Sequence, residues 1–327
     1  MRNVIVLGCG RSGTSMVAGL FAHAGYSMGR GLFAANRGNP RGIFESREVN
    51  RINEAILAPW PPPGKSRRAL TARLRERIRP TYRRWLSTVP IETDVAAERR
   101  TPSIERRIGR ALARTPWCLK DPRFAYTLDC WRPQLGDPLF VCVFREPERT
   151  AASILREVAT RDYLRGAAFD MQAARQLWAS TYRWILERHA GSGRWLFVHA
   201  EQVVEGSAVA RLEEATGAPL DADFADASLQ SRVDARNARS AIDDGARGLY
   251  VELCKRADWD PRWSRTWASI DASPSSSRRR TPPASSAVCS MPRWPCRTPA
   301  RSRRSSSSTT ARRTRRPRSW HDIPSDC

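Results

Sequence analysis

The apolar positions of the chain fall into two patterns that alternate along it. Apolar runs lie at residues 4–7 and 139–144, and shorter ones lie near Trp117 and within 194–199, as is typical of strands buried on both faces of a parallel sheet. Helices are predicted over residues 14–24, 47–57, 66–87 (interrupted by Pro80), 103–114, from Arg145 to about 160, 171–188 and 209–216, and apolar residues recur at helical spacing in 14–24, 66–87 and 171–188. This alternation predicts an α/β domain with a central parallel sheet over residues 1–270.

The segment after the first strand combines glycines with hydroxyl side chains. Gly8, Gly10 and Gly13 allow the backbone to turn sharply and bring its N–H groups close to a ligand. Thr14 and Ser15 then open a helix whose positive end faces the same point. These features favour phosphate or sulfate as the ligand.

Three kinds of anion site compete for this segment. A nucleoside-triphosphatase loop requires lysine after its last glycine, where this chain has Thr14. A dinucleotide fingerprint fits the three glycines but also requires an acidic residue about 20 positions further on, where the sequence reads Tyr26-Ser-Met-Gly-Arg30. ATP or GTP hydrolysis is therefore disfavoured. An NAD(P)-binding oxidoreductase and a non-catalytic anion-binding module remain as alternatives.

Arg11-Ser-Gly-Thr-Ser15 resembles the 5′-phosphosulfate loop of bacterial sulfotransferases that use 3′-phosphoadenosine 5′-phosphosulfate (PAPS). Arg145 follows a predicted strand and Ser153 lies eight residues later, the separation with which this family holds the 3′-phosphate. A guanidinium and a hydroxyl are suitable ligands for a phosphate monoester. Two looser segments also resemble the family: residues 39–45, which end in Phe44-Glu45, and Glu201, although Ala200 replaces the family's tyrosine.

The resemblance implies a three-layer α/β/α, P-loop nucleoside-triphosphatase-like fold. It also implies PAPS as the donor, PAP as the product and no metal. The implied donor site consists of Gly10, Arg11, Ser12, Gly13, Thr14, Ser15, Arg145 and Ser153.

Four residues are candidates for the chemistry of transfer, which consists mostly of alignment and charge stabilisation. By resemblance, Arg11 would stabilise the departing phosphate oxygen and Lys120 would contact the sulfonate. Glu45 and Asp121 compete as the base that removes the acceptor's proton. Glu45 is preferred because Lys120 and Arg123 are expected to keep Asp121 ionised, and Asp121 could instead anchor its loop by ion pairing.

The formal charge of +23 comes almost entirely from arginine, since Lys65, Lys120 and Lys255 are the only lysines. No nucleic-acid-binding motif accompanies this charge, so we expect no specific nucleic-acid partner. The expected partner is a small-molecule or glycan acceptor with a hydroxyl or an amine.

The cysteines and the apolar runs indicate the cellular compartment. The eight cysteines form no Cys-x-x-Cys pair and are expected to be reduced core residues. No apolar run has the length of a signal peptide or membrane span, so a cytoplasmic location is expected.

Residues 271–327 are rich in Ser, Arg and Pro, and we expect them to be disordered. They could be a natural basic tail or, as we prefer, an out-of-frame translation.

Overall fold

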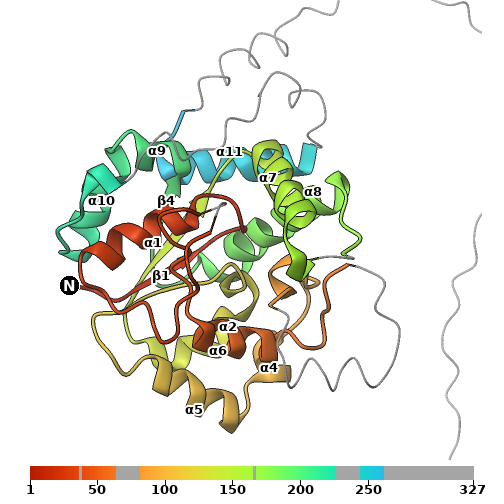
Figure 1. The fold of residues 1–327 in the computed structure, drawn as a ribbon, viewed down its shortest axis with the longest axis horizontal. Helices are drawn as coiled ribbons and strands as arrows, with labels where there is room; N and C mark the ends of the chain where they lie inside the picture. The colour runs from red at the N-terminus through yellow and green to blue at the C-terminus, as the bar shows by residue number, and fades with distance from the viewer. Residues whose placement is uncertain (37–38, 64–81, 165–166, 225–243, 261–327) are drawn as a thin grey trace, which may run out of the picture. The chain divides into compact units, whose positions relative to one another are not determined.

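The computed structural model describes residues 1–36, 39–63, 82–164, 167–224 and 244–260. Within these residues, four strands form one sheet in the order β2-β1-β3-β4, and every pairing is parallel. The strands are β1 (Val4–Leu7), β2 (Cys118–Lys120), β3 (Leu139–Phe144) and β4 (Arg194–His199). The predicted parallel sheet is therefore confirmed, with all four strands in their expected places (Figure 1).

Helices connect and flank the strands. The longer ones are α1 (Thr14–His23), α2 (Arg47–Ile56), α5 (Pro102–Ala111), α6 (Phe124–Leu135), α7 (Pro147–Thr160), α8 (Met171–Trp184), α10 (Ser207–Thr216) and α11 (Asp244–Ala257). The short ones are α4 (Val95–Arg99) and α9 (Ala200–Val204), the 3₁₀ turns at Arg84–Leu86, Asp162–Leu164 and Ala222–Phe224, and a π-turn at Ile185–His189.

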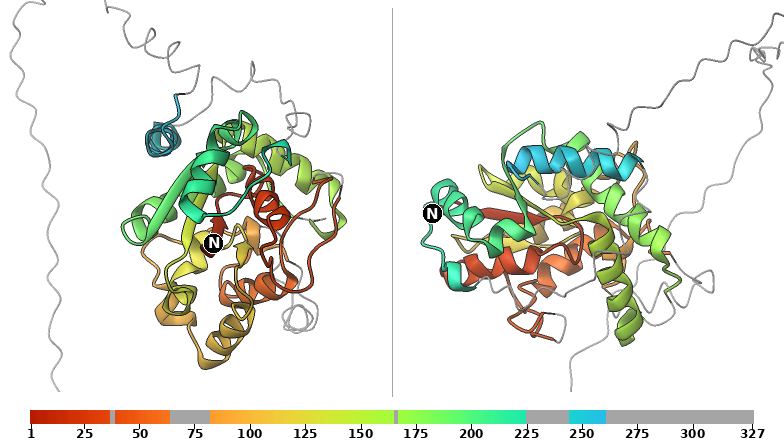
Figure 2. Two further views of the ribbon diagram at one scale, coloured as in Figure 1. Left: turned by 90° about the vertical axis from the view of Figure 1, so that its left-hand side faces the viewer. Right: turned by 90° about the horizontal axis from the view of Figure 1, so that it is seen from above.

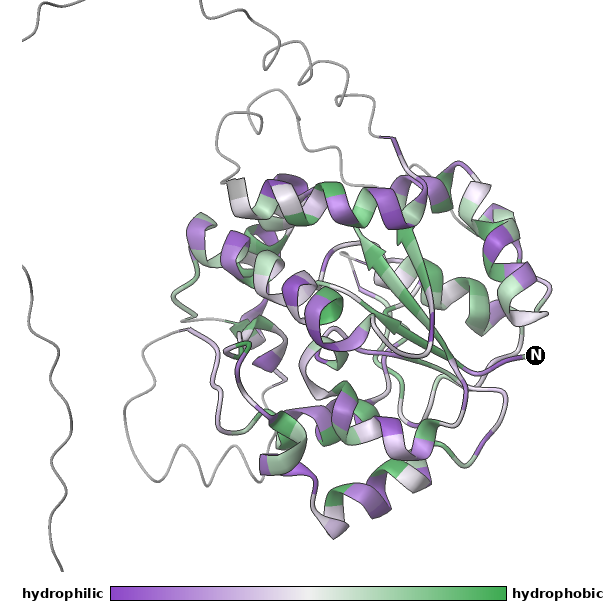
Figure 3. Ribbon diagram, turned by 180° about the vertical axis from the view of Figure 1, so that it is seen from behind, coloured by the Kyte–Doolittle hydropathy of each residue, from purple (hydrophilic) through white to green (hydrophobic). Residues whose placement is uncertain are grey.

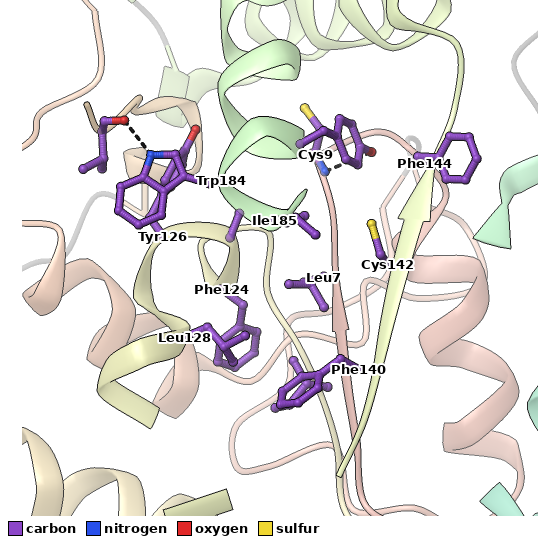
Figure 4. Packing of buried hydrophobic residues seen from close by; sticks show 14 of the residues in the cluster. Leu7, Cys9, Phe124, Tyr126, Leu128, Phe140, Cys142, Phe144, Trp184 and Ile185 are labelled. Atoms are coloured by element: carbon purple, nitrogen blue, oxygen red, sulfur yellow. Dashed lines mark hydrogen bonds between the residues drawn. The ribbon is translucent and has the colours of Figure 1, made fainter. Parts of the chain in front are cut away.

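The side chains of the strands alternate between two hydrophobic clusters, one on each face of the sheet. Val4 and Val6 lie in the cluster with α1, α9 and α10, whereas Ile5 and Leu7 lie in the cluster with α2, α5, α6, α8 and α11. Figure 4 shows part of the second cluster, where Leu7 and Phe140 lie near Phe124 of α6. Helices thus cover both faces, which confirms the three-layer α/β/α arrangement (Figures 1 and 3).

The loop between α1 and α2 is tied to the start of α2. The Ser46 hydroxyl accepts hydrogen bonds from the backbone N–H groups of Glu48 and Val49, which makes it the N-cap of α2. It also donates to the carbonyl of Arg30, with an O–O distance of 2.7 Å. The loop therefore reaches α2 in a fixed direction, and Glu45 immediately precedes the cap.

Several helices differ from the prediction. The segments that form α4, α6, α9 and α11 were not predicted as helices, and the helix expected to continue to residue 188 changes to a π-turn at Ile185. α11, the blue helix in Figure 2, packs on β4 and α8. Of the helix expected over residues 66–87, positions 66–81 lie outside the described residues, and Arg84–Leu86 form a 3₁₀ turn. The tail at 271–327 also lies outside them. Cys9, Cys118, Cys130, Cys142 and Cys254 are buried and free, as expected.

Candidate active site

A cavity of about 1050 Å³ opens at the carboxyl edge of the sheet. Every strand contributes to its wall, because Gly10 follows β1, Lys120 ends β2, Arg145 follows β3 and Ala200 follows β4. Ligands of open α/β sheets bind at this edge. The cavity is therefore the candidate site.

The glycine loop (residues 8–15) connects β1 to α1 and borders the cavity. Gly8 has a φ of +143°, and a Cβ added there would lie 2.1 Å from the carbonyl oxygen of Val143, so only glycine fits. Arg11 has a φ of +73°, a conformation that costs a non-glycine residue about 1–2 kcal/mol. Such backbone strain is found mostly at binding and catalytic sites.

A buried tyrosine supports the glycine loop from the side of the core. The Tyr182 hydroxyl of α8 accepts a hydrogen bond from the Cys9 amide at 3.2 Å. It also lies 3.0 Å from Ser12 Oγ and 2.9 Å from the carbonyl oxygen of Val143. Burial raises the pKa of Tyr182 well above its usual value, so the hydroxyl stays neutral. The loop is thus held in shape by the protein itself.

Ser12 differs from its predicted place. Its side chain is fully buried between Tyr182 and Thr150, and it does not line the cavity. The Ser12 hydroxyl therefore supports the loop from the side of the core.

The two predicted motifs of the donor site meet in space. Arg11 Nε donates a hydrogen bond to Ser153 Oγ at 3.3 Å, across 142 positions of sequence. The Arg11 guanidinium also lies 3.8 Å from the carboxylate of Glu157, one turn further along α7. Burial lowers the pKa of Arg11, although the charge of Glu157 opposes this shift. The strand-end motif and the glycine loop therefore form one site.

Arg145 is a buried cation on the wall of the cavity. Its residue is 7 % exposed, and its Nε has no hydrogen-bond partner among the described residues. Burial lowers the pKa of Arg145, and the charge of Arg149 adds to this shift. The indole N–H of Trp178 donates to the Arg145 carbonyl at 3.1 Å and so fixes the backbone. An anionic ligand would supply the partner that this guanidinium lacks.

Lys120 and Glu45 form an ion pair on the cavity wall. The Lys120 ammonium lies 2.6 Å from Glu45 Oε1 and also donates to Ser15 Oγ and the Ile43 carbonyl, at 3.0 and 3.3 Å. Its three N–H donors thus have three partners. A sulfonate that contacts Lys120 must displace one of them, and Glu45 is the partner with a competing negative charge.

Asp121 is enclosed behind the cavity wall. It is fully buried and does not line the cavity. One carboxylate oxygen accepts from the backbone and guanidinium of Arg123, both at 2.9 Å, and the other accepts from Asn50 and Asn53 at 2.6 and 3.0 Å. Burial alone would lower the pKa of Arg123, but Asp121 and Glu54 raise it. Asp121 therefore has the geometry of a structural anchor.

Of the predicted site residues, nine line this one cavity: Gly10, Arg11, Gly13, Thr14, Ser15, Glu45, Lys120, Arg145 and Ser153.

Three residues that contact and position these side chains or the glycine loop were not predicted from the sequence. Asn50 donates to Glu45 as well as to Asp121, and a signal was available, since Asn50, Asn53 and Glu54 interrupt the apolar face of α2. Glu157 follows Ser153 by one helical turn, which also places it on the same face. Tyr182 gave no signal among the apolar residues of α8.

Comparison with known proteins identifies the family. The sulfotransferase family profile matches residues 3–222 of the 327-residue chain, a span that contains every predicted site residue. The chain belongs to the sulfotransferase family. This membership sets aside the alternative of an NAD(P)-dependent oxidoreductase, and the sulfotransferase is accordingly a transferase.

Two solved structures resemble this sulfotransferase. The sulfotransferase domain from the Synechococcus PCC 7002 olefin synthase is 14% identical, with a TM-score of 0.42, and the match covers 79% of this chain and 95% of that one. The sulfotransferase domain from the curacin biosynthetic pathway is 12% identical, with a TM-score of 0.45 and coverage of 80% and 99%. No curated protein matches the chain.

The described part of the sulfotransferase contains neither a candidate membrane-spanning helix nor a candidate metal cluster. None of its helices there has the length and apolar character needed to cross a membrane. No group of three or more His, Cys, Asp or Glu side chains there could hold a metal ion.

Proposed function

We propose that this sulfotransferase uses PAPS as its donor and transfers the sulfuryl group to a hydroxyl or amine of a small molecule or glycan. The observation that carries the proposal is Arg145, a buried guanidinium that lines the cavity and whose Nε lacks a partner among the described residues. The glycine loop is an anion site of its own. A donor with phosphate groups at both its 5′ and 3′ positions suits this pair of anion sites.

On this proposal, Arg145 and Ser153 bind the 3′-phosphate and the glycine loop binds the 5′-phosphosulfate. PAPS supplies an activated sulfuryl group attached to a good leaving group. The Arg11 guanidinium contacts Ser153 and Glu157 of α7. On this proposal it turns toward the 5′-phosphosulfate when the donor binds, and its charge then stabilises the phosphate oxygen that becomes negative as the S–O bond breaks.

Glu45 is the proposed base, and Lys120 is proposed to contact the sulfonate. Glu45 lines the cavity, whereas the buried Asp121 has both oxygens occupied by hydrogen-bond donors. This contrast supports Glu45 as the group that receives the acceptor's proton. When Lys120 turns to the sulfonate, Glu45 loses its ion-pair partner and becomes free to accept that proton.

The donor assignment is tested by calorimetric titration with three ligands. PAP should bind tightly, adenosine 5′-phosphate should bind more weakly because it lacks the 3′-phosphate, and NADPH should not bind. Transfer of labelled sulfate from PAPS then separates an enzyme from a non-catalytic anion-binding module. Equal affinities for PAP and adenosine 5′-phosphate would contradict the proposed 3′-phosphate site.

A further inference from the structure

Among the described residues, six aromatic ones line the cavity, and they include two pairs that touch each other. Phe33 and Tyr82 meet edge to face with ring centroids 5.1 Å apart. The Trp85 indole N–H donates to the Tyr163 hydroxyl at 3.1 Å. These four residues come from the loop before α2, the segment before the Arg84–Leu86 turn, the turn itself, and the turn that follows α7. We call them the aromatic wall.

The aromatic wall reaches from the glycine loop to the proposed base. A Cβ added at Gly10 would lie 2.7 Å from the Trp85 ring, so this ring lies directly against the loop. At the other end, the Phe33 amide donates to the Glu45 carbonyl at 3.1 Å, and Phe44 precedes Glu45. A hydroxyl group placed at Glu45 would therefore have aromatic rings beside the rest of its molecule.

Most polar atoms of the aromatic wall are already used within the protein. The Tyr82 hydroxyl accepts from Arg51 Nε at 3.2 Å, and the Trp85 N–H is bound to Tyr163. Burial raises the pKa of Tyr163 to about 12, so its hydroxyl is neutral and is not a competing base. The wall consequently offers ring surfaces more than hydrogen-bonding groups, and the Arg47 guanidinium lies over the Phe33 ring, 5.1 Å from its centroid.

Backbone strain marks the same region. Phe44 and Tyr82 have φ angles of +54° and +55°, in the left-handed region that costs non-glycine residues about 1–3 kcal/mol. Both residues line the cavity. Glycine would satisfy either turn without this cost, so the contacts of the two side chains offset it: Phe44 packs against Phe224 with ring centroids 5.9 Å apart, and Tyr82 packs against Phe33.

We propose that the acceptor carries its hydroxyl on a flat aromatic skeleton. This inference rests on the proposed function. The cavity of about 1050 Å³ exceeds the range of about 300–1000 Å³ typical for one small ligand, so it has room for a donor and such an acceptor. Aromatic rings stack on a flat aromatic skeleton in offset or edge-to-face geometry, which adds to the free energy gained from the apolar area that the contact buries.

Every bond and proton in the proposed transfer is accounted for by the donor, the acceptor and Glu45. The phenolic oxygen forms a bond to the sulfur of the donor as the bond from sulfur to the phosphate oxygen breaks. The phenolic proton passes to Glu45, and PAP leaves with the electron pair of the broken bond. No oxidant, reductant or further reactant is required.

The test uses 2-naphthol and N-acetyllactosamine as acceptor probes. Calorimetry on the PAP-loaded protein measures binding of each probe, and labelled PAPS measures transfer. We expect 2-naphthol to bind and to be sulfated, and N-acetyllactosamine to do neither. Phe33→Ala should raise the Kd for 2-naphthol about tenfold or more, because an aromatic contact is lost, while the Kd for PAP changes less than about twofold. Leu32→Ala is the matched control, since the neighbouring Leu32 is 45 % exposed and does not line the cavity.

The outcomes separate the inference from the proposed function. If the wild-type protein does not bind PAP, the proposed function itself fails. If PAP binds but N-acetyllactosamine is the probe that is sulfated, or if 2-naphthol neither binds nor reacts, the aromatic acceptor is overturned while the donor site stands. An unchanged Kd for 2-naphthol in Phe33→Ala would overturn the role of the aromatic wall.

Discussion

Replacing Arg145 by alanine should have opposite effects on donor binding and on stability. Arg145 is 7 % exposed, and its Nε has no hydrogen-bond partner among the described residues. A charge-assisted hydrogen bond contributes about 1.5–3 kcal/mol, and a loss of about 2–3 kcal/mol corresponds to a Kd for PAP that rises roughly 30- to 150-fold. The free protein, by contrast, loses a buried charge that lacks a bonded counter-ion, so Tm should stay constant or rise.

Two ligands make this test specific. PAP and adenosine 5′-phosphate differ only in the 3′-phosphate, so Arg145→Ala should weaken the binding of PAP strongly and that of adenosine 5′-phosphate little. Arg149→Ala is a suitable control, because Arg149 already pairs with Glu146 and Glu201 at 2.9 and 2.8 Å. Equal losses for both ligands, or an unchanged affinity for PAP, would refute the assignment of Arg145 to the 3′-phosphate.

Four other substitutions probe the reaction and the core. Arg11→Ala should lower kcat about a hundredfold with the fold intact by circular dichroism, because Arg11 acts on charge that develops in the transition state; a change confined to KM would contradict that role. Glu45→Gln should abolish transfer and keep PAP affinity, and near-normal turnover of this variant would shift the role of base to Asp121. Asp121→Asn should lower the free energy of unfolding by about 3 kcal/mol or more, because it leaves buried Arg123 without its partner. Burial, together with the charges of Arg145 and Arg149, lowers the pKa of His199 from 6.5 to about 3. Below pH 6.5 the unfolded chain therefore binds a proton at this histidine, whereas the native protein does not. The free energy of unfolding should consequently fall by about 1.4 kcal/mol for each pH unit below 6.5. Urea unfolding at pH 7, 6 and 5 should show that the free energy of unfolding depends less on pH in His199→Gln than in the wild type. The same pH dependence in both proteins would contradict the lowered pKa of His199.

The strands were predictable because their pattern is local. β1 and β3 are apolar at every position and buried on both faces, and periodicity also located α1, α2 and α7. α6 was not predictable in this way, since Phe124, Ala125, Tyr126, Thr127 and Leu128 are all buried. A helix that is buried on most sides has no polar face to reveal its period. The same helix contains Pro133, a residue that is unfavourable in a helix interior.

In the candidate site, too, the features that depend on a short stretch of sequence were predictable, and those that depend on contacts between distant segments were not. The glycine loop, Arg145 and Ser153 are short motifs whose spacing is visible in the sequence. The inward direction of Ser12 depends on Tyr182, and the choice between Glu45 and Asp121 depends on Asn50 and on burial. These contacts join segments 71 and 170 positions apart, and no pattern within one segment encodes them.

The hydrogen bond between the Cys9 amide and the Tyr182 hydroxyl spans 173 positions of the chain. During synthesis, the glycine loop leaves the ribosome near the beginning, but the tyrosine that supports it is added much later. At about 5–20 residues per second, this delay is roughly 10–35 s. The glycine loop is therefore made first but gains the hydrogen bond from Tyr182 only after more than half of the chain has been synthesised, and a nascent chain that ends before α8 would lack this support.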